Sequence, residues 1–370
     1  MYSGRKEVIV YGLGKDFEDF RKTIEAEYQV VGYSDTDIDK ANRYSPFIAV
    51  DEIREKENHV LITSTKYFDE IKASLIAKGI GEDRIEEGGL ERLIQKPVLV
   101  VTIHAGMGNI LFCYAFGQML QEIHPEVPVY YDISWYFEIN RPFARLLTHL
   151  EKMFHLSLPA ADEETVKRAK RQGYTVQRES LVFEEKYFKI NQGFFRGYWE
   201  TSKYFSGVKE KIREKYQFDE AFLSAEQKNI LEKIRNTESV AVWFRRGDYL
   251  APENIGCFGN ICTQEYYDKA MNYMKSRYKD AAFFIFSNDS EYIAEHYSEY
   301  NLMLYDDDTS DIKDYDMYLM SSCKHLIIAN STFSWWAAWL HGDKGTIIAP
   351  EKWLNEREDT DIWEEYWIKM

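Results

Sequence analysis

Two arginines and an aspartate stand directly after a short apolar run in the second half of the chain. The run is Ser239–Phe244, and the residues that follow it are Arg245-Arg246-Gly247-Asp248. A short, continuous run rich in β-branched residues predicts a buried strand of a parallel sheet, and such sheets bind ligands at the carboxyl ends of their strands. Two adjacent cations need an anionic partner when they leave water, and the planar guanidinium suits a diphosphate. The pattern predicts a site for a diphosphate, with a sugar nucleotide as the obvious ligand.

A second group of polar side chains follows another predicted strand, Leu326–Ala329. The group comprises Asn330, Ser331, Thr332 and Ser334, and it opens a helix that is rich in tryptophan. Asn330 or Ser331 suits the N-cap of that helix, and free N–H groups beside hydroxyls suit a phosphate. The alternative is that each of these residues only caps the helix. The tryptophans are interpreted as packing residues.

A glycine turn follows the predicted strand Val98–Ile103 and carries Gly106, Gly108 and Asn109. Small residues let the backbone approach a ligand closely, but a tight turn alone uses the same residues. We interpret this turn as a weaker candidate for ligand contact than the arginine pair.

Another pair of glycines, Gly12 and Gly14, lies near the N-terminus. Phe17 occupies the position of the third glycine of the dinucleotide-binding motif, although Asp35 follows at the spacing of a ribose-binding acid. The interpretation favoured here is a Rossmann-like fold without a bound dinucleotide.

Alternating strands and helices must position these residues, and they predict parallel sheets. The first block is expected to hold strands Val8–Tyr11, Gln29–Tyr33 and Val60–Thr63 with helices Asp16–Ala26 and Tyr67–Lys78. A domain boundary is expected between Gly88-Gly89 and Pro97, because glycine pairs and proline interrupt regular structure.

The rest of the chain opens with the strand Val98–Ile103 and the helix Ile110–Ile123, which is apolar almost all round and so predicted to be buried. Residues 125–225 give no clear elements. Further strands are expected at Val240–Phe244, Ala282–Ser287, Leu326–Ala329 and Thr346–Ala349.

Bulk composition narrows the class of protein. The chain has 370 residues, a formal net charge of −16 and a pI near 5.1, which argue against nucleic acid as a partner and against a large patch for anionic membranes. Four cysteines without metal-ligand spacing, and no apolar run of about 18 residues, predict a cytoplasmic protein. Peripheral contact with a membrane and the oligomeric state are left open.

The sequence offers little support for a metal site or for a hydrolase active site. Asp306-Asp307-Asp308 resembles the metal-binding acids of some glycosyltransferases, but it reads as an exposed loop with no partner histidine. No metal is therefore expected. No histidine pairs with a plausible nucleophile, which disfavours a serine or cysteine hydrolase.

Several ordered segments resemble glycosyltransferase family 11, the α-1,2-fucosyltransferases. They are Ala105–Gly117, Arg245–Tyr249, Met317–Ser321, Ile328–Leu340, Ala349–Trp353 and Trp367–Lys369. The resemblance covers residues 98–370. Residues 1–95 fall outside it and look like a small Rossmann-like domain attached to sugar-modifying enzymes.

The resemblance implies an α/β fold of the GT-B type, with two Rossmann-like halves. Residues 98–230 would form the acceptor half and residues 231–370 the donor half, preceded by the small domain at 1–95. It also implies an inverting, metal-independent transfer of L-fucose from GDP-β-L-fucose to the 2-hydroxyl of a galactoside in a surface polysaccharide or glycolipid. The partners would be the sugar nucleotide and this glycan.

The family also implies roles for individual residues. Arg245 would neutralise the β-phosphate as the sugar–phosphate bond breaks, and Arg246 would bind the donor with it. The cluster that opens the later helix, Asn330, Ser331, Thr332 and Ser334, would complete the anion site. Gly106, Gly108 and Asn109 would lie on the acceptor side.

Asp248 has two possible roles. It is the carboxylate nearest to the arginines in sequence, so it is either the base that activates the acceptor or the group that holds Arg245 or Arg246 in place.

Two positions depart from the family pattern. Trp243 stands where histidine is usual, and Asn288 with Asp289 stands where two acids are usual. These positions are expected to approach the nucleotide base, with Trp243 offering a stacking face and Asn288 a neutral carbonyl. Ile110 and Gln118 also differ, on the acceptor side. The alternatives are therefore another sugar nucleotide on the same fold, or a nucleotide-sugar-binding protein that has lost catalysis.

Overall fold

The structure, a computed structural model, describes residues 5–41, 43–88, 96–138, 150, 153–154, 156, 158–176, 182–302, 315–357 and 360–370. The chain divides into two compact units. The first contains Met1–Val98 with Asp162–Tyr174 and Gln192–Phe194, and the second contains Leu99–Ala161, Thr175–Asn191 and Phe195–Met370. This division does not separate 98–230 from 231–370, so that boundary stays a prediction. Gly89 and Asp306-Asp307-Asp308 lie outside the described residues.

The first unit is a parallel four-stranded sheet with helices, in the order β2-β1-β3-β4. Its elements are β1 (Glu7–Tyr11), α1 (Lys15–Glu27), β2 (Gln29–Ser34), α2 (Ile38–Ala41), η1 (Val50–Glu55), β3 (His59–Ile62), α3 (Phe68–Ala77), η2 (Glu82–Arg84), β4 (Ile85–Glu87) and α8 (Glu163–Gln172). Alternate residues of β1 enter two separate apolar clusters, one on each face of the sheet. The predicted Rossmann-like arrangement of this block is confirmed.

The helix α8 was not predicted, and it packs on α1 within this unit. Arg171 donates to Asp16 at 3.0 Å and to Asp19 at 2.5 Å, and its guanidinium lies 5.1 Å from the ring of Phe20. Asp162 caps α8 by accepting from the backbone N–H of Thr165. The segment Asp162–Tyr174, which lies far along the chain from Val98, is therefore part of the first unit.

A four-stranded sheet follows along the chain, in the order β6-β5-β8-β7. The elements of this part are β5 (Leu99–Thr102), α5 (Met107–Ile123), β6 (Val129–Asp132), α6 (Ser134–Glu138), β7 (Tyr174–Val176), η3 (Glu185–Lys189), β8 (Gly193–Arg196), η4 (Ser202–Val208), α9 (Lys209–Lys215) and η5 (Glu220–Phe222). The helix α5 is buried nearly all round, as its sequence predicts.

A parallel six-stranded sheet follows, in the order β11-β10-β9-β12-β13-β14. Its elements are α10 (Ala225–Asn236), β9 (Glu238–Phe244), η6 (Gly247–Leu250), α11 (Ile255–Phe258), α12 (Gln264–Arg277), β10 (Ala281–Ser287), α13 (Ser290–His296), β11 (Asn301–Leu302), α15 (Asp316–Ser322), β12 (His325–Ile327), α16 (Thr332–His341), β13 (Ile347–Ala349) and β14 (Ile368–Lys369). All four strands predicted in this region are confirmed.

The central strand β9 is buried on both faces. Val240, Val242 and Phe244 belong to one apolar cluster, while Ala241 and Trp243 belong to the other. This burial explains the continuous apolar run, and it brings the arginine pair to the carboxyl edge of the sheet. Two sheets, a four-stranded one in which β5 and β6 pair in parallel and this parallel six-stranded one, agree with the predicted GT-B class.

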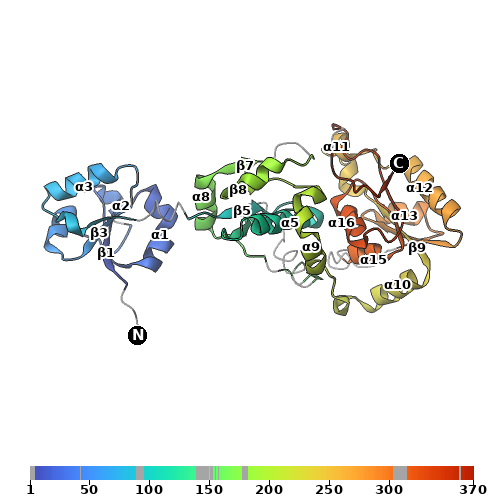
Figure 1. The fold of residues 1–370 in the computed structure, drawn as a ribbon, viewed down its shortest axis with the longest axis horizontal. Coiled ribbons are helices and arrows are strands. Elements are labelled where there is room, and N and C mark those ends of the chain that lie inside the picture. The colour runs from blue at the N-terminus through green and yellow to red at the C-terminus, as the bar shows by residue number, and fades with distance from the viewer. Residues whose placement is uncertain are drawn as a thin grey trace. The chain divides into compact units, whose positions relative to one another are not determined.

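An aromatic core joins the two halves within the second unit. The helix α16 packs on α5 and on α15 (Figure 1). The ring centroids of Phe112 and Trp336 are 4.8 Å apart, and Trp335, Trp336 and Trp339 are fully buried. The interpretation of these tryptophans as packing residues is confirmed. Among the described residues, no helix is long and apolar enough to cross a membrane.

Candidate active site

Arg245 lies at the carboxyl end of β9 with part of its guanidinium unpaired. Its Nη2 donates to Oδ2 of Asp248 at 2.8 Å, and its Cζ lies 5.0 Å from the ring centre of Tyr249. Its Nε is buried and has no hydrogen-bond partner among the described residues. A buried N–H without a partner costs about 1–3 kcal/mol, so this edge of the guanidinium is suited to an incoming anion.

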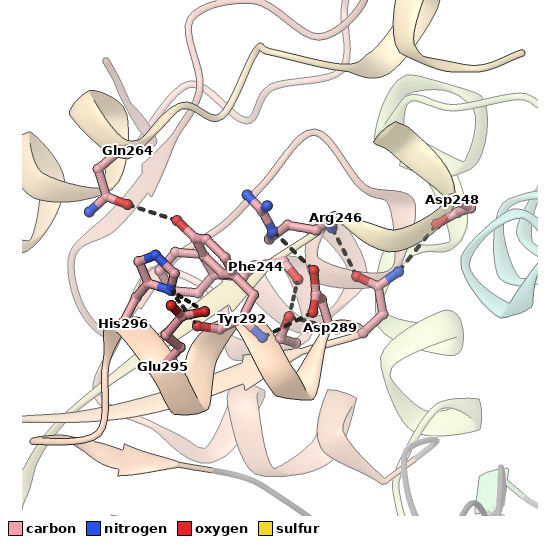
Figure 2. Close-up of polar contacts among 10 residues, drawn as sticks. Phe244, Arg246, Asp248, Gln264, Asp289, Tyr292, Glu295 and His296 are labelled. Carbon is pink, nitrogen blue, oxygen red and sulfur yellow. Dashed lines mark hydrogen bonds and ion pairs between the residues drawn. The ribbon is translucent and has the colours of Figure 1, made fainter. Parts of the chain in front are cut away.

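Arg246 is held by contacts within the protein. Its Nε donates to Oδ2 of Asp289 at 3.1 Å, and its Cζ lies 3.4 Å from the ring centre of Tyr292. Figure 2 shows this guanidinium beside Asp289 and over Tyr292, whose hydroxyl donates to Gln264 at 2.9 Å. Asp289 also caps α13 by accepting from the N–H of Tyr292 at 3.1 Å. The charge of Arg246 is therefore largely balanced before any ligand binds.

Asn288 ties the arginine loop together. Its Oδ1 accepts from the backbone N–H of Arg246 at 2.9 Å, and its Nδ2 donates to Oδ1 of Asp248 at 3.2 Å. A Cβ added to Gly247 would lie 2.6 Å from Nδ2 of Asn288, and the φ of that glycine is +25°. The side-chain polar atoms of Asn288 and Asp289 therefore form hydrogen bonds within the protein. A contact of either residue with a nucleotide base stays a prediction.

Asp248 accepts one hydrogen bond at each carboxylate oxygen, from Arg245 and from Asn288. Its side chain is about half exposed, at 51 %. Of the two roles considered from the sequence, this geometry favours positioning of Arg245.

Asn330 is buried and its side chain forms hydrogen bonds to two other segments, at Phe258 and Trp353. Its Nδ2 donates to the carbonyl oxygens of Phe258 at 3.2 Å and Trp353 at 3.1 Å, and Cys262 Sγ lies 3.5 Å from its Oδ1. Its own carbonyl accepts from the hydroxyl of Tyr249 at 3.1 Å. Both amide hydrogens are therefore used inside the protein.

Replacing Asn330 with alanine is expected to lower the free energy of unfolding by about 2 kcal/mol or more, because two buried carbonyl groups lose their donors. Chemical denaturation measures the change. The matched control is Ser331→Ala in the same turn, since the hydroxyl of Ser331 does not cap α16. A stable Asn330→Ala variant with a raised KM for the donor would instead place the amide on the ligand.

The other residues at the start of α16 differ in exposure. Ser334 is fully buried, and its hydroxyl lies within 3.2 Å of the carbonyl oxygens of Ala329 and Ser331. Ser331 is buried and Thr332 is half-buried. Without a side-chain cap, the first N–H groups of this ten-residue helix are left for another acceptor.

The N-terminus of α5 meets the N-terminus of α16. A Cβ on Gly108 would lie 2.5 Å from the carbonyl carbon and from Oγ1 of Thr332, and the indole N–H of Trp336 donates to the carbonyl of Gly108 at 2.8 Å. Gly106 has open space where its Cβ would be, and Oδ1 of Asn109 is buried without a hydrogen-bond partner in the described ranges. The glycine turn is therefore brought to the start of α16.

Trp243, on β9, packs against the first turn of α16. Its ring is 5 % exposed and lies 4.9 Å from that of Phe333, and its indole N–H is buried with no partner in the described part of the chain. The structure places Trp243 beneath the site, so stacking on a nucleotide base stays a prediction.

Three further residues near these groups were missed by sequence reasoning. His104 precedes the glycine turn, is buried, and packs 4.5 Å from the ring of Tyr198; burial lowers the pKa of its imidazole. Tyr249 lies between Arg245 and Asn330, and burial raises its pKa. Glu200 follows β8, and burial raises its pKa to about 7. Only His104 and Tyr249 adjoin a motif, so only they could have been found by inspection.

The glycine turn of the first unit is closed by a side chain. Oδ2 of Asp35 accepts from the backbone N–H of Leu13 at 2.6 Å, and Asp16 and Glu18 occupy the first turn of α1. Acids at this helix end disfavour a phosphate, which supports the interpretation of a Rossmann-like fold without a dinucleotide.

In the described ranges, no group of three His, Cys, Asp or Glu side chains is arranged to hold a metal ion. A cavity of about 1150 Å³ opens near the amino ends of β9 and β12, where Glu238 and His325 line it. It contains none of the site residues predicted from the sequence.

Comparison with known proteins finds two family matches along the chain. Residues 101–370 match the model of Glycosyl transferase family 11, and residues 4–86 match a family described as C2185-like, N-terminal. The chain is 31% identical over 292 residues to an Alpha-1,2-colitosyltransferase of Escherichia coli, covering 74% of this chain and 99% of that protein. It is 24% identical to the O-antigen biosynthesis glycosyltransferase WbnK of Escherichia coli, covering 72% and 99%.

More distant similarities extend to animal and rhizobial proteins. A Galactoside alpha-(1,2)-fucosyltransferase 1 of Saimiri boliviensis boliviensis is 26% identical, covering 54% of this chain and 57% of that protein. Among solved structures, the fucosyltransferase NodZ from Bradyrhizobium is 11% identical, with a TM-score of 0.39, covering 66% and 93%. The family match spans most of the chain and includes both the arginine loop and the glycine turn, and we conclude that this chain belongs to glycosyltransferase family 11.

Proposed function

We propose that this protein is an inverting α-1,2-glycosyltransferase that moves L-fucose from GDP-β-L-fucose to the 2-hydroxyl of a galactoside in a surface polysaccharide or glycolipid. The observation that carries the proposal is the Nε of Arg245, which has no partner among the described residues and lies at the carboxyl edge of a parallel sheet. The helix α16, which has no side-chain cap, begins at the same edge. Both features suit a diphosphate.

Residues 98–230 are proposed to bind the acceptor and residues 231–370 the donor. When the bond between C1 of the sugar and the β-phosphate oxygen breaks, negative charge gathers on the diphosphate. Arg245, oriented by Asp248, stabilises that charge together with the first N–H groups of α16. The buried Ser331 and the half-buried Thr332 would complete the anion site at this helix.

A second candidate donor is favoured by the relative named as a colitosyltransferase, to which this chain is 31% identical. Colitose is L-fucose without its 3-hydroxyl, so one diphosphate site serves both donors. The difference would lie in the contact with that hydroxyl, and a site built to hydrogen-bond a hydroxyl rejects the analogue that lacks it.

Nucleotide binding tests the proposal first. Titration calorimetry with GDP, UDP, ADP and CDP is expected to show tightest binding for GDP, and release of GDP is then followed with the fucose and colitose donors and a galactoside. Preference for another nucleotide would overturn the donor assignment. Binding of GDP without release of GDP from either donor would indicate a binding protein.

A further inference from the structure

Glu200 lies in a tightly fixed turn after β8. Sγ of Cys113, on α5, contacts the carbonyl of Gly197 at 3.4 Å. The ring of Trp199 stacks on Phe116 at 3.9 Å, and its φ is +56°, a left-handed conformation that bulky residues rarely adopt. The cost of such a conformation is of order 1–3 kcal/mol and is met by surrounding contacts, which is typical of functional turns.

The residue after Glu200 is fixed as well. The N–H of Thr201 donates to the carbonyl of Trp199 at 2.8 Å, and its hydroxyl donates to the carbonyl of Asp361 at 2.9 Å. Thr201 is 1 % exposed. The position of Glu200 is therefore set on both sides by contacts that do not involve its own carboxylate.

The carboxylate of Glu200 has no compensating partner. It is half-buried, and among the described residues it makes no hydrogen bond or ion pair. Its titratable neighbours are Cys113 from α5, Tyr198 from its own turn and Tyr249 from η6, each of which its charge influences. None of these is a cation, so burial alone raises the pKa of Glu200, to about 7.

Tyr249 links Glu200 to the phosphate site. The charges of Arg245 and Glu200 act on its phenol in opposite directions, and burial has the largest effect on its raised pKa. The ring lies 5.0 Å from the guanidinium of Arg245. The turn that carries Glu200 also lies beside the glycine turn, because the ring of Tyr198 packs 4.5 Å from that of His104, two residues before Gly106.

We propose that Glu200 is the general base of the transfer, taking the proton from the attacking acceptor hydroxyl. This inference rests on the proposed function. The acceptor oxygen forms its bond to C1 as the bond between C1 and the phosphate oxygen breaks, and the electron pair leaves with the nucleoside diphosphate. The hydroxyl proton passes to the Glu200 carboxylate and then to water.

Inversion places the base and the leaving group on opposite faces of the sugar. Asp248 is bonded to Arg245 and so lies with the leaving group, and its two oxygens are already engaged. Glu200 belongs to the other half and has both oxygens unpaired with described residues. A base also works best when its pKa is near the working pH, which holds for Glu200.

The test compares Glu200→Gln, Glu200→Asp and wild type in the full-length protein. Glu200→Gln is expected to lower kcat by about 10²–10⁴-fold while the calorimetric affinity for GDP stays within about threefold (under about 0.7 kcal/mol). In wild type, kcat/KM should decrease as the pH is lowered past about 7, because this carboxyl becomes protonated. This acid limb of the pH profile should be absent in Glu200→Gln. Glu200→Asp should keep the limb at a reduced rate. Glu122→Gln, an exposed ion-pair residue on α5, is the matched control and should match wild type.

Melting curves separate catalysis from folding. The folded-state pKa of about 7 lies above the ordinary value of 4.5, so wild type should lose stability as pH rises between these values. Glu200→Gln should lack that loss and melt at or above wild type at pH 8. A merely structural Glu200 would shift the melting temperature and leave the pH limb in place.

The outcomes distinguish the two proposals. If wild type transfers sugar and Glu200→Gln keeps both its rate within about threefold (under about 0.7 kcal/mol) and its acid limb, the base assignment is wrong and the proposed function stands. If wild type releases no nucleoside diphosphate from any donor, the proposed function is wrong and the base assignment falls with it.

Discussion

Replacing Arg245 with alanine is expected to lower kcat by about 10³-fold or more, the magnitude seen when a preorganised charge contact to a transition state is removed. The guanidinium has one edge on Asp248 and a buried Nε with no partner among the described residues. A leaving diphosphate would satisfy that N–H, and the contact would strengthen as charge develops. The affinity for GDP should fall as well, because the product carries the same diphosphate.

Steady-state release of GDP and calorimetry measure the two effects. Arg235→Ala is the matched control, since this arginine forms an exposed ion pair with Glu220. It should leave kcat unchanged, because exposed pairs contribute little to stability. Activity of Arg245→Ala within about tenfold of wild type, equal to about 1.4 kcal/mol, would show that this arginine does not stabilise the leaving group.

The second large effect is expected from Gly108→Ala, which should abolish measurable transfer and lower the free energy of unfolding by about 1–3 kcal/mol. The added methyl would lie 2.5 Å from the carbonyl carbon of Thr332 and 2.7 Å from the backbone nitrogen of Phe333. Backbone atoms cannot rotate away, so the N-termini of α5 and α16 must separate. Both the glycine turn and the proposed anion site would move with them.

Gly106→Ala provides the control for this prediction. It lies two residues earlier, and beyond its own chain neighbours no atom lies within 4 Å of its added methyl. A methyl at this N-cap should cost under about 1 kcal/mol. Thermal melts and kcat of the two variants should therefore differ sharply. Equal behaviour would mean that the contact between the two helix ends is not needed for activity.

Much of the fold was predictable because its strands are buried on both faces. β9 and β10 read as continuous apolar runs, and the polar residues after β9 mark the edge of its sheet. The segment around 125–225 was not predictable, since β7 and β8 are short and, unlike the equally short β12 and β13, lie among aromatic and charged residues with no apolar run to mark them. Strands that short carry no periodicity of their own and depend on neighbours supplied by the rest of the fold.

The candidate site was predictable in part. The arginine loop and the start of α16 each follow a strand, so their shared edge could be inferred from local sequence. The internal bonds of Asn330 and Ser334 could not, because their partners are carbonyl groups of other turns. Glu200 was also missed, since its neighbour Tyr249 lies 49 residues away (249 − 200) and no motif marks the turn.

The buried amide of Asn330 and hydroxyl of Ser334 have a consequence for engineering. With these side chains committed to the interior, a diphosphate at α16 would be held chiefly by main-chain N–H groups. The peptide backbone is the same whatever sugar the nucleotide carries. Variants with new donor selectivity should therefore be sought by randomising positions around the hexose, leaving this helix end as inherited.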